Sequence, residues 1–312
     1  MDGYLIAYDQ EEFALPVLLG WDLSHGMGTP ADAFEVSFIY DASMGEALSK
    51  AARFRAVHGG ETVFYGVVDE YEVTLGQGGL TAKVSGRGLQ ALLLDNEAEA
   101  AEYYGASLDF ILARHALPWG VTSVRANYFV LPGLFTVASG SSQWRVLQDF
   151  AFFGGGVRPR FTRDGVLLLN GETGKALKID WESPVLRARY SERRYGVVSQ
   201  ALVKNKAARI STVADNRAFQ ARGGLCRRVI NMPRTTYYDA LRHTGEYQIV
   251  RSAEGSRSCT ITLPQLFAAV AGDTVSLSSE KLGLTGNFDV FESRCFADGS
   301  EAGTELTLYQ KD

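Results

Sequence analysis

The sequence predicts an α+β protein that is mainly β, with two small β-barrels on either side of a mixed α+β middle segment. Three observations support this fold class. Stretches of alternating apolar and polar residues recur towards both ends of the chain, which is the period of half-buried strands. The chain has 33 Gly but only 8 Pro among its 312 residues, as expected for strands joined by tight turns. Apolar residues at helical spacing are concentrated between these two regions.

The first barrel is expected over residues 1–95. Phe34, Val36 and Phe38 share one face of a predicted strand. A longer strand over 63–73 ends at a glycine-rich turn, after which the chain returns as a paired strand. Repeated hairpins at this spacing are typical of a small barrel or sandwich.

The middle domain is expected over residues 96–180. Ser107 can cap a helix whose buried side is marked by Leu108, Ile111 and Leu112, at the i, i+3, i+4 spacing of an amphipathic helix. A proline follows the end of this pattern, as is common after a helix. We therefore expect a helix here, with Ala116 as its last apolar position.

Further elements of the middle segment follow from composition. Residues 89–94 and the Ala- and Glu-rich stretch 96–103 are predicted to be helical, as is 142–153, which three glycines terminate. Residues 158–170 are predicted to form a hairpin that turns at Asp164 and Gly165.

The second barrel is expected over residues 181–312, with one helix near 236–251. Strands separated by Gly-bearing turns are predicted at 259–263, 274–277, 287–295 and 304–309. Strands from about 181–210 are also candidates for completing the first barrel.

Composition argues against several classes of protein. No apolar run reaches the roughly 18 to 20 residues of a membrane-spanning helix, and the first residues lack the basic and apolar regions of a secretory signal. The three cysteines, Cys226, Cys259 and Cys295, are odd in number and widely spaced. We therefore expect no membrane segment and free thiols in a reducing cytosol.

No arrangement of residues indicates catalysis. The four histidines are isolated from one another and from cysteine. Residues 171–175 resemble a phosphate loop, but their glycine spacing is short and Ala176 replaces the hydroxyl that would bind magnesium. Four acidic residues within 95–102 are interpreted as a solvated helix face. We predict no catalytic, cofactor-binding or metal-binding residues, no cofactor and no enzymatic activity.

Charge is segregated along the chain. Residues 1–150 hold 8 Lys and Arg against 19 Asp and Glu, a balance of −11. Residues 151–260 hold 20 against 9, a balance of +11, and the remainder has a balance of −5. Such a chain could dock head to tail, acidic surface on basic surface. The alternative is that the segments fold against each other and their charges partly cancel.

The arginine-rich segment supplies the candidate docking residues. A nucleic-acid surface is one interpretation, but no helix-turn-helix, zinc-finger or RNP-type pattern organises these charges. Arginine at strand spacing also suits pairing with the carboxylates of a neighbouring subunit. We favour subunit docking and expect no sequence-specific nucleic acid. The predicted docking residues are Arg187, Arg189, Arg193, Arg194, Arg227 and Arg228.

The order of these parts resembles the baseplate hub proteins of phage tails, the late-control-protein-D-like group. The resemblance covers nearly the whole chain and depends on the sequence of parts rather than on one motif. It is carried by a barrel strand, a strand leading into a helix, the two middle helices with the hairpin after them, and a closing barrel. These segments are residues 62–69, 85–90, 107–120, 142–148, 160–167, 271–277, 286–290 and 303–308.

The resemblance implies a structural role. Such hubs carry two tail-tube-like barrels per chain and assemble as homotrimers, giving a pseudo-sixfold ring that adapts the tail tube of a contractile tail to the spike. The implied partners are the tail tube protein, the spike protein and other baseplate proteins, with the tape measure protein as a further candidate. The implied location is the virion tail baseplate, assembled in the cytoplasm of the bacterial host.

Three alternatives remain open at this point. A tail-tip hub of a long non-contractile tail would share the fold. A cell-wall-degrading tail enzyme would need only two suitably placed carboxylates, although no pattern marks which two. A cell-surface binding module is disfavoured because a secretory signal is not evident.

Overall fold

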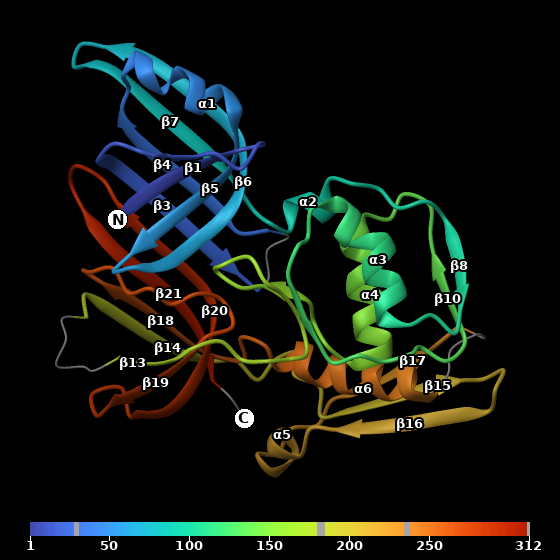
Figure 1. Cartoon of the computed structure of the whole chain (residues 1–312). Helices are drawn as coiled ribbons and strands as arrows, with labels where there is room; N and C mark the ends of the chain where they lie inside the picture. The colour runs from blue at the N-terminus through green and yellow to red at the C-terminus, as the bar shows by residue number, and fades with distance from the viewer. Residues whose placement is uncertain (28–30, 180–184, 234–237, 311–312) are drawn as a thin grey trace.

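The computed structural model describes residues 1–27, 31–179, 185–233 and 238–310 (Figure 1). Within these residues, strands dominate and three separate hydrophobic cores are present. The predicted fold class, α+β and mainly β, is confirmed. No helix in the described part of the chain is long and apolar enough to cross a membrane.

The first β unit, residues 1–88, is built around stacked aromatic rings. Phe34 and Phe54 stack with their ring centroids 4.3 Å apart, and Phe64 packs beside them. These side chains alternate with exposed residues, as the sequence predicts. Its strands are β1 (Asp2–Ala7), β2 (Glu12–Ala14), β3 (Leu18–Gly26), β4 (Ala33–Ile39), β5 (Ala51–His58), β6 (Glu61–Gly76) and β7 (Gly79–Gly88). A short 3-10 turn, η1 (Ala42–Met44), and helix α1 (Gly45–Lys50) connect β4 to β5.

The middle unit, residues 89–169, packs helices against small sheets. The predicted cap at Ser107 is present, since its Oγ accepts from Phe110 N at 3.2 Å. The predicted helix over 142–153 is also capped, with Ser142 Oγ accepting from Arg145 N at 3.2 Å. Phe150 is fully buried in the core of this unit. The helical elements are α2 (Ala91–Leu94), α3 (Leu108–His115), η2 (Leu117–Trp119) and α4 (Gln143–Gly155). The strands are β8 (Ala101–Tyr104), β9 (Val124–Ala126), β10 (Leu134–Val137), β11 (Arg160–Phe161) and β12 (Leu167–Leu169).

The predicted helix over residues 96–103 is wrong. The end of this stretch is strand β8, which pairs with β10 so that Tyr103 lies opposite Phe135. Ala101 and Tyr103 pack against the core while Glu102 and Tyr104 are exposed, which is a strand's period of two. Pairing with a distant strand therefore overrides the helix propensity of Ala and Glu.

The second β unit, the described residues of 176–192 with 257–310, is a mainly antiparallel arrangement with its own core, in which one strand pair is parallel. Cys259, Ile261, Phe288 and Leu308 are fully buried within it. Its strands are β13 (Ala176–Ile179), β14 (Arg187–Glu192), β18 (Arg257–Leu263), β19 (Thr274–Ser279), β20 (Leu284–Ala297) and β21 (Ala302–Gln310).

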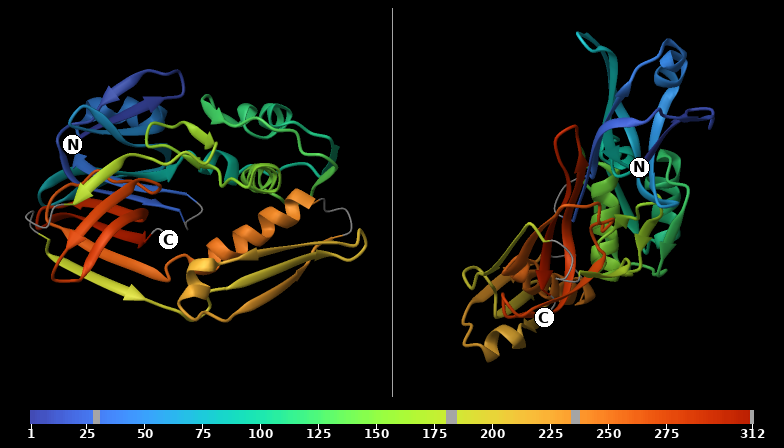
Figure 2. Two further views of the ribbon diagram at one scale, coloured as in Figure 1. Left: turned by 90° about the horizontal axis from the view of Figure 1, so that it is seen from below. Right: turned by 90° about the vertical axis from the view of Figure 1, so that its left-hand side faces the viewer.

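An inserted unit, residues 200–253, lies between β14 and β18 in sequence. A three-stranded sheet is covered on one face by a long helix, seen in the left view of Figure 2. Its elements are β15 (Gln200–Asn205), β16 (Ile210–Asp215), α5 (Arg217–Ala221), β17 (Arg227–Asn231) and α6 (Tyr238–Ala253). Strands of 181–210, considered above for the first barrel, have other partners: β14 pairs with β18, and β15 with β16 and β17. The domain division at 95 and 180 stays a prediction.

The two β units have the same strand order. The first runs β3-β4-β7-β6-β5-β1 and the second runs β14-β18-β21-β20-β19-β13. The last pair differs, because β1 is antiparallel to β5 whereas β13 is parallel to β19. The units are joined edge to edge where β20 pairs with β3, so they share one sheet. The two β units therefore form a continuous body, with the middle unit beside it (Figures 1 and 2).

Candidate subunit interface

The shared sheet contains a run of eight strands. Among the described strands, the edge of β14 at one end is unpaired, and the edge of β6 at the other end is unpaired beyond Val67. The run is β14-β18-β21-β20-β3-β4-β7-β6, and every neighbouring pair in it is antiparallel. Because the number of strands is even, the first and last strands point in opposite directions. Copies related by rotation could therefore join these edges as an antiparallel pair.

One free edge is basic. Among the described strands, β14 pairs only with β18, and it carries Arg187 and Arg189 on the exposed side of the sheet. These two arginines line a groove of about 570 Å³ together with Glu292, Arg294 and Glu305 of the neighbouring strands. Exposed strand edges invite pairing with another chain unless something covers or blocks them.

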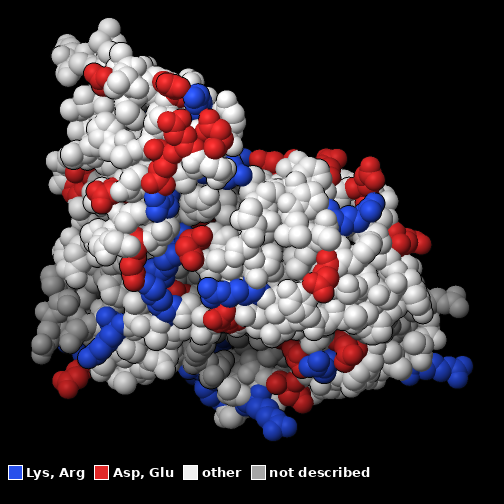
Figure 3. Space-filling model, viewed as in Figure 1, with Lys and Arg blue, Asp and Glu red and all other residues white. Residues whose placement is uncertain are grey.

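The other free edge is acidic. We call residues 69–76 of β6 the distal β6 segment; among the described strands it pairs only with β7, because β5 contacts β6 only as far as Val67. The segment carries Asp69, Glu70 and Glu72. Asp69 is engaged by Arg87 within the chain, at 2.7 Å. Acidic side chains gather over the first β unit in the view of Figure 3.

The opposite face of the distal β6 segment is apolar and uncovered. Tyr71, Val73 and Leu75 are 47%, 39% and 78% exposed, although they lie on the same side of the sheet as buried Ala82 and Val84. The core-facing surface of the first β unit thus extends beyond the part that the described chain covers. An apolar strip that continues a core is typical of a protein interface.

The outward face of the eight-strand run is polar and ion-paired. Arg294 of β20 binds Asp22 of β3 across the joint between the units, with Nη2 to Oδ2 at 2.6 Å. On β7, Lys83 pairs with Glu35 of β4 at 2.7 Å. The side chains of this face alternate with the buried residues of both cores, so the sheet separates a polar surface from an apolar interior.

The six predicted docking arginines do not form one cluster. Arg193 and Arg194 directly follow β14; Arg193 donates to the carbonyl of Tyr195, and Arg194 lies 3.6 Å from Glu192. The other pair, Arg227 and Arg228, lies on β17 of the inserted unit, where Arg228 donates to Gln248 of α6 at 3.0 Å. Docking through all six therefore stays a prediction, and only the β14 group lies at the edge of the shared sheet.

A buried ion pair fixes the middle unit to the second β unit. Arg163, on the β11–β12 turn, donates to Asp273 at 2.5 Å and to the carbonyl of Ala268 at 2.8 Å. Asp273 also accepts from Lys175 N at 2.8 Å and from Val270 N at 3.0 Å. Sequence reasoning missed this pair, because its partners are 110 residues apart and no local pattern links them.

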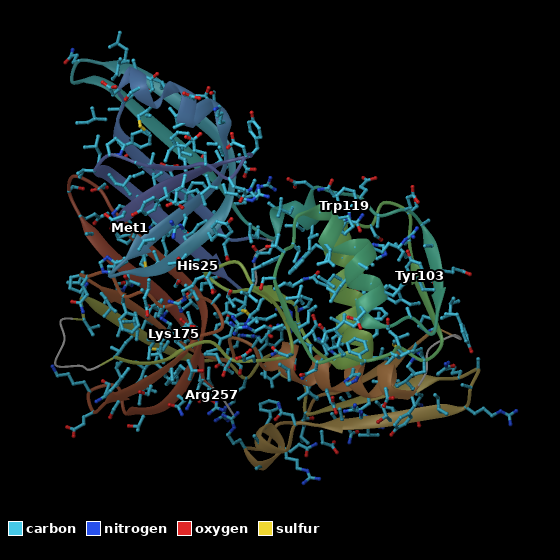
Figure 4. All side chains as sticks on the ribbon, in the orientation of Figure 1. Met1, His25, Tyr103, Trp119, Lys175 and Arg257 are labelled. Carbon is cyan, nitrogen blue, oxygen red and sulfur yellow. The ribbon has the colours of Figure 1, made fainter. Side chains whose placement is uncertain are left out.

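The glycine-containing loop over 171–175 packs against Asp273, as expected for a turn rather than a phosphate site. A Cβ on Gly174 would lie only 2.1 Å from Asp273 Oδ1, so only glycine fits there. Lys175, labelled in Figure 4, reaches across to Glu61 of the first β unit with a 2.5 Å contact. This loop therefore helps to hold both β units together.

Two buried titratable groups, His115 and Cys259, have surroundings typical of structural residues. His115 contacts Gln143 through Nδ1 at 2.7 Å and Tyr103 through Nε2 at 3.1 Å, and burial lowers its pKa. Burial raises the pKa of the Cys259 thiol to about 11, which suppresses its reactivity. No group of three or more His, Cys, Asp or Glu side chains in the described residues is placed to hold a metal ion.

The predicted acidic helix face is also wrong in its geometry. Asp95 hydrogen-bonds to Arg87 at 2.7 Å, which lowers the pKa of the Asp95 carboxyl, and Glu102 lies on strand β8. The remaining acids, Glu97 and Glu99, are exposed. Solvation of these side chains was therefore anticipated, but a shared helix face was not found.

Comparison with known proteins gives structural neighbours only. No protein-family model matches the chain, and no curated protein matches it in sequence. The 43 kDa tail protein of prophage MuSo2 from Shewanella oneidensis has a TM-score of 0.76 at 17% identity, over 99% of this chain and 98% of that one. The tail protein from Neisseria meningitidis MC58 has a TM-score of 0.75 at 18% identity, over 99% and 96%.

A third neighbour is also a prophage protein. The prophage tail protein gp18 from Listeria monocytogenes EGD-e has a TM-score of 0.61 at 13% identity, over 100% of this chain and 96% of that one. At these identities the likeness concerns the fold, and it extends over essentially the full length of all three neighbours. The predicted resemblance is confirmed at that level: this chain has the fold of phage and prophage tail proteins.

Proposed function

We propose that this chain is a structural subunit of the baseplate hub of a phage or phage-like contractile tail. One observation carries the proposal: two β units of equal strand order share a single sheet through β20 and β3, and the run ends in free edges of opposite direction and charge. Repetition of this arrangement by rotation leads to a closed ring rather than a filament when the rotation closes.

Three copies in the ring would present six similar β units. Such a ring has threefold symmetry in its chains and approximate sixfold symmetry in its β units, so it can join a sixfold tube to a threefold spike. The polar, ion-paired face of the shared sheet would then line the ring, and the middle and inserted units would lie outside it. The fold of the tail-protein neighbours supports this role.

The proposed work is adaptation of symmetry, without catalysis or a cofactor. The partners are further copies of this chain, the tail tube protein, the spike protein and neighbouring baseplate proteins. The proposed location is the tail baseplate of the particle. The contacts of His25 and His115 and the burial of Cys259 and Cys295 are consistent with a structural role.

Native mass spectrometry and negative-stain imaging of the purified chain test the proposal, alone and mixed with candidate tube and spike proteins. We expect a mass of three copies and a ring with a central opening. A chain that stays monomeric in every mixture would refute the hub role. Hydrolysis of purified cell walls by the monomer would instead support the enzymatic alternative.

A further inference from the structure

The joint between the two β units within one chain provides a template for the contact between copies. Strands β6 and β20 are the two long strands, of 16 and 14 residues, and each has a register shift midway. The shifts lie at Val68/Glu70 and Val290/Glu292. Before the shift, β6 pairs with β5 and β20 pairs with β19; after it, β20 changes partner to β3.

The corresponding part of β6 has no such partner among the described strands. After its shift, β20 crosses from its own unit to the edge strand of the other unit. The distal β6 segment occupies the same position in the first β unit, with β7 on one side and an open edge on the other. By the strand order, the strand that corresponds to β3 is β14.

We propose that β14 of one copy pairs in antiparallel fashion with the distal β6 segment of the next copy, repeating the β20–β3 joint between chains. This inference rests on the proposed ring, and it adds the strands, the register and the charges of the contact. The binding partner in this contact is a second copy of this chain. Opposite charge on the two edges, basic on β14 and acidic on β6, favours this partner.

The register follows from tracing equivalent positions through the first β unit. Glu70, directly after the shift in β6, lies opposite Ser85 of β7. Ser85 lies opposite Glu35 of β4, and Glu35 lies opposite Asp22 of β3. The path therefore ends at Asp22 on the edge strand.

The same path in the second β unit ends on β14. Glu292, directly after the shift in β20, lies opposite Thr307 of β21. Thr307 lies opposite Thr260 of β18, and Thr260 lies opposite Arg189 of β14. Because the two paths begin at equivalent positions and cross equivalent strands, Arg189 is the counterpart of Asp22.

The joint inside the chain then fixes the pairing between chains. Phe296 of β20 lies opposite Asp22 of β3. The residue of β6 at the same distance from its shift as Phe296 is Thr74. Thr74 of one copy therefore faces Arg189 of the next.

The remaining pairs follow from antiparallel alignment. Glu70 faces Arg193, so the first acid after the shift meets an arginine directly. Glu72 faces Ser191, which places it diagonally between Arg189 and Arg193, within reach of long side chains. Each acidic side chain of the segment that points to the polar face thus has an arginine within reach.

Charges at the two joints are exchanged. Inside the chain, Arg294 on β20 binds Asp22 on β3 at 2.6 Å. Its counterparts are Glu72 on β6 and Arg189 on β14, the same kind of diagonal pair with the signs reversed. This exchange preserves attraction at the joint between chains.

The apolar face is complementary in the same register over Val73 and Leu75, whereas Tyr71 faces Glu192. Val73 faces Tyr190 and Leu75 faces Ala188, and both β14 residues pack against the core of the second β unit. The uncovered apolar strip of one copy would therefore continue the core of the next. Burial of this strip and pairing of two free edges would contribute to the contact beyond the ion pairs.

Charge reversal tests the ion pairs. We expect Glu72→Arg alone and Arg189→Glu alone to weaken trimer assembly at least about tenfold, measured by native mass spectrometry across a dilution series. The double variant, with Glu72→Arg and Arg189→Glu together, should recover most of that loss. The matched control is Lys206→Glu with Arg217→Glu, which reverses two exposed cations of the inserted unit outside the predicted docking residues and should leave assembly unchanged.

Cross-linking tests the register independently of charge. With Cys226 replaced by Ser, a chain carrying Thr74→Cys and Arg189→Cys should yield linked trimers with a short bismaleimide. A chain that carries only one of the two new cysteines should yield no linked species, because the two contacting surfaces are different. A chain with Thr74→Cys and Arg217→Cys serves as the control for random coupling.

The outcomes separate this inference from the proposed function. A wild-type trimer that is insensitive to both charge reversals and gives no link between positions 74 and 189 would overturn the β14–β6 contact and leave the ring intact. A wild-type chain that never forms a trimer would overturn both. Linked dimers from either chain with only one of the two new cysteines would indicate a symmetric contact and would also refute the proposed pairing.

Discussion

The buried pair of Arg163 and Asp273 should decide whether the middle unit stays fixed to the second β unit. The two side chains are 10% and 2% exposed, and the carboxylate additionally accepts two backbone N–H groups. Replacing Arg163 with Met keeps much of its apolar stem but leaves the buried carboxylate without its cation. Asp273→Asn keeps the shape but presents an NH₂ group where only donors surround it.

The expected cost follows from the partners left behind. Breaking a buried ion pair by removing one side typically costs about 3–5 kcal/mol, because the remaining charge is desolvated and uncompensated. Arg163→Met should fall in this range. Asp273→Asn should cost about 2–4 kcal/mol, since one hydrogen bond to a charged group is lost and one donor is left facing another. The double variant should cost clearly less than the sum, because each change removes the partner that the other leaves unsatisfied.

Urea unfolding followed by tryptophan fluorescence gives these free energies of unfolding for the four chains of the cycle. Lys175→Ala is the matched control: it removes the other ion pair of the same region, Lys175 with Glu61, whose side chains are largely exposed. That variant should lose no more than about 1 kcal/mol. Additive costs for Arg163→Met and Asp273→Asn, or a cost for Arg163→Met as small as that of Lys175→Ala, would refute the reasoning.

Three further predictions concern local structure. Ser142→Ala should lower the free energy of unfolding by about 1 kcal/mol in urea titrations, because α4 loses its N-cap. Gly86→Ala should prevent β6–β7 pairing and abolish soluble expression, since the new Cβ would lie 1.9 Å from Val67 O. Burial lowers the pKa of His115 below 6.5, so the unfolded chain binds the proton more readily and stability falls as pH drops below about 6.5. His115→Gln should flatten that fall in thermal melts at pH 5 to 7; an unchanged slope would contradict it.

Local patterns predicted the elements that depend on local physics. Ser107 and Ser142 mark helix starts because a side-chain oxygen satisfies a free backbone N–H within the same turn, which is visible in the sequence. Likewise, alternation of Phe34, Val36 and Phe38 with polar residues predicts a strand with one buried face. The partner of each capping serine lies within a few residues, and the buried face of the strand needs only an apolar core to pack against.

Long-range pairing could not be predicted in this way. Residues 96–103 have helix-forming composition, yet β8 becomes a strand because β10 supplies a partner about thirty residues later. The strand signals near β15 do not indicate which strands pair with it. The position of β15 in a separate sheet could therefore not be predicted. The exposure of Tyr71 and Val73 was equally hidden, since their spacing is that of core residues.

A chain with two β units of the same strand order must avoid joining them in the wrong combination. In the proposed ring, β3 accepts β20 and β14 accepts β6, although the backbone geometry alone would allow the reverse. If β6 met β3, Glu72 would approach Asp22; if β20 met β14, Arg294 would approach Arg189. Like charges brought together at an interface cost several kcal/mol. The exchange of signs between two otherwise equivalent joints therefore favours the alternating order, and with it a ring in which first and second β units strictly alternate.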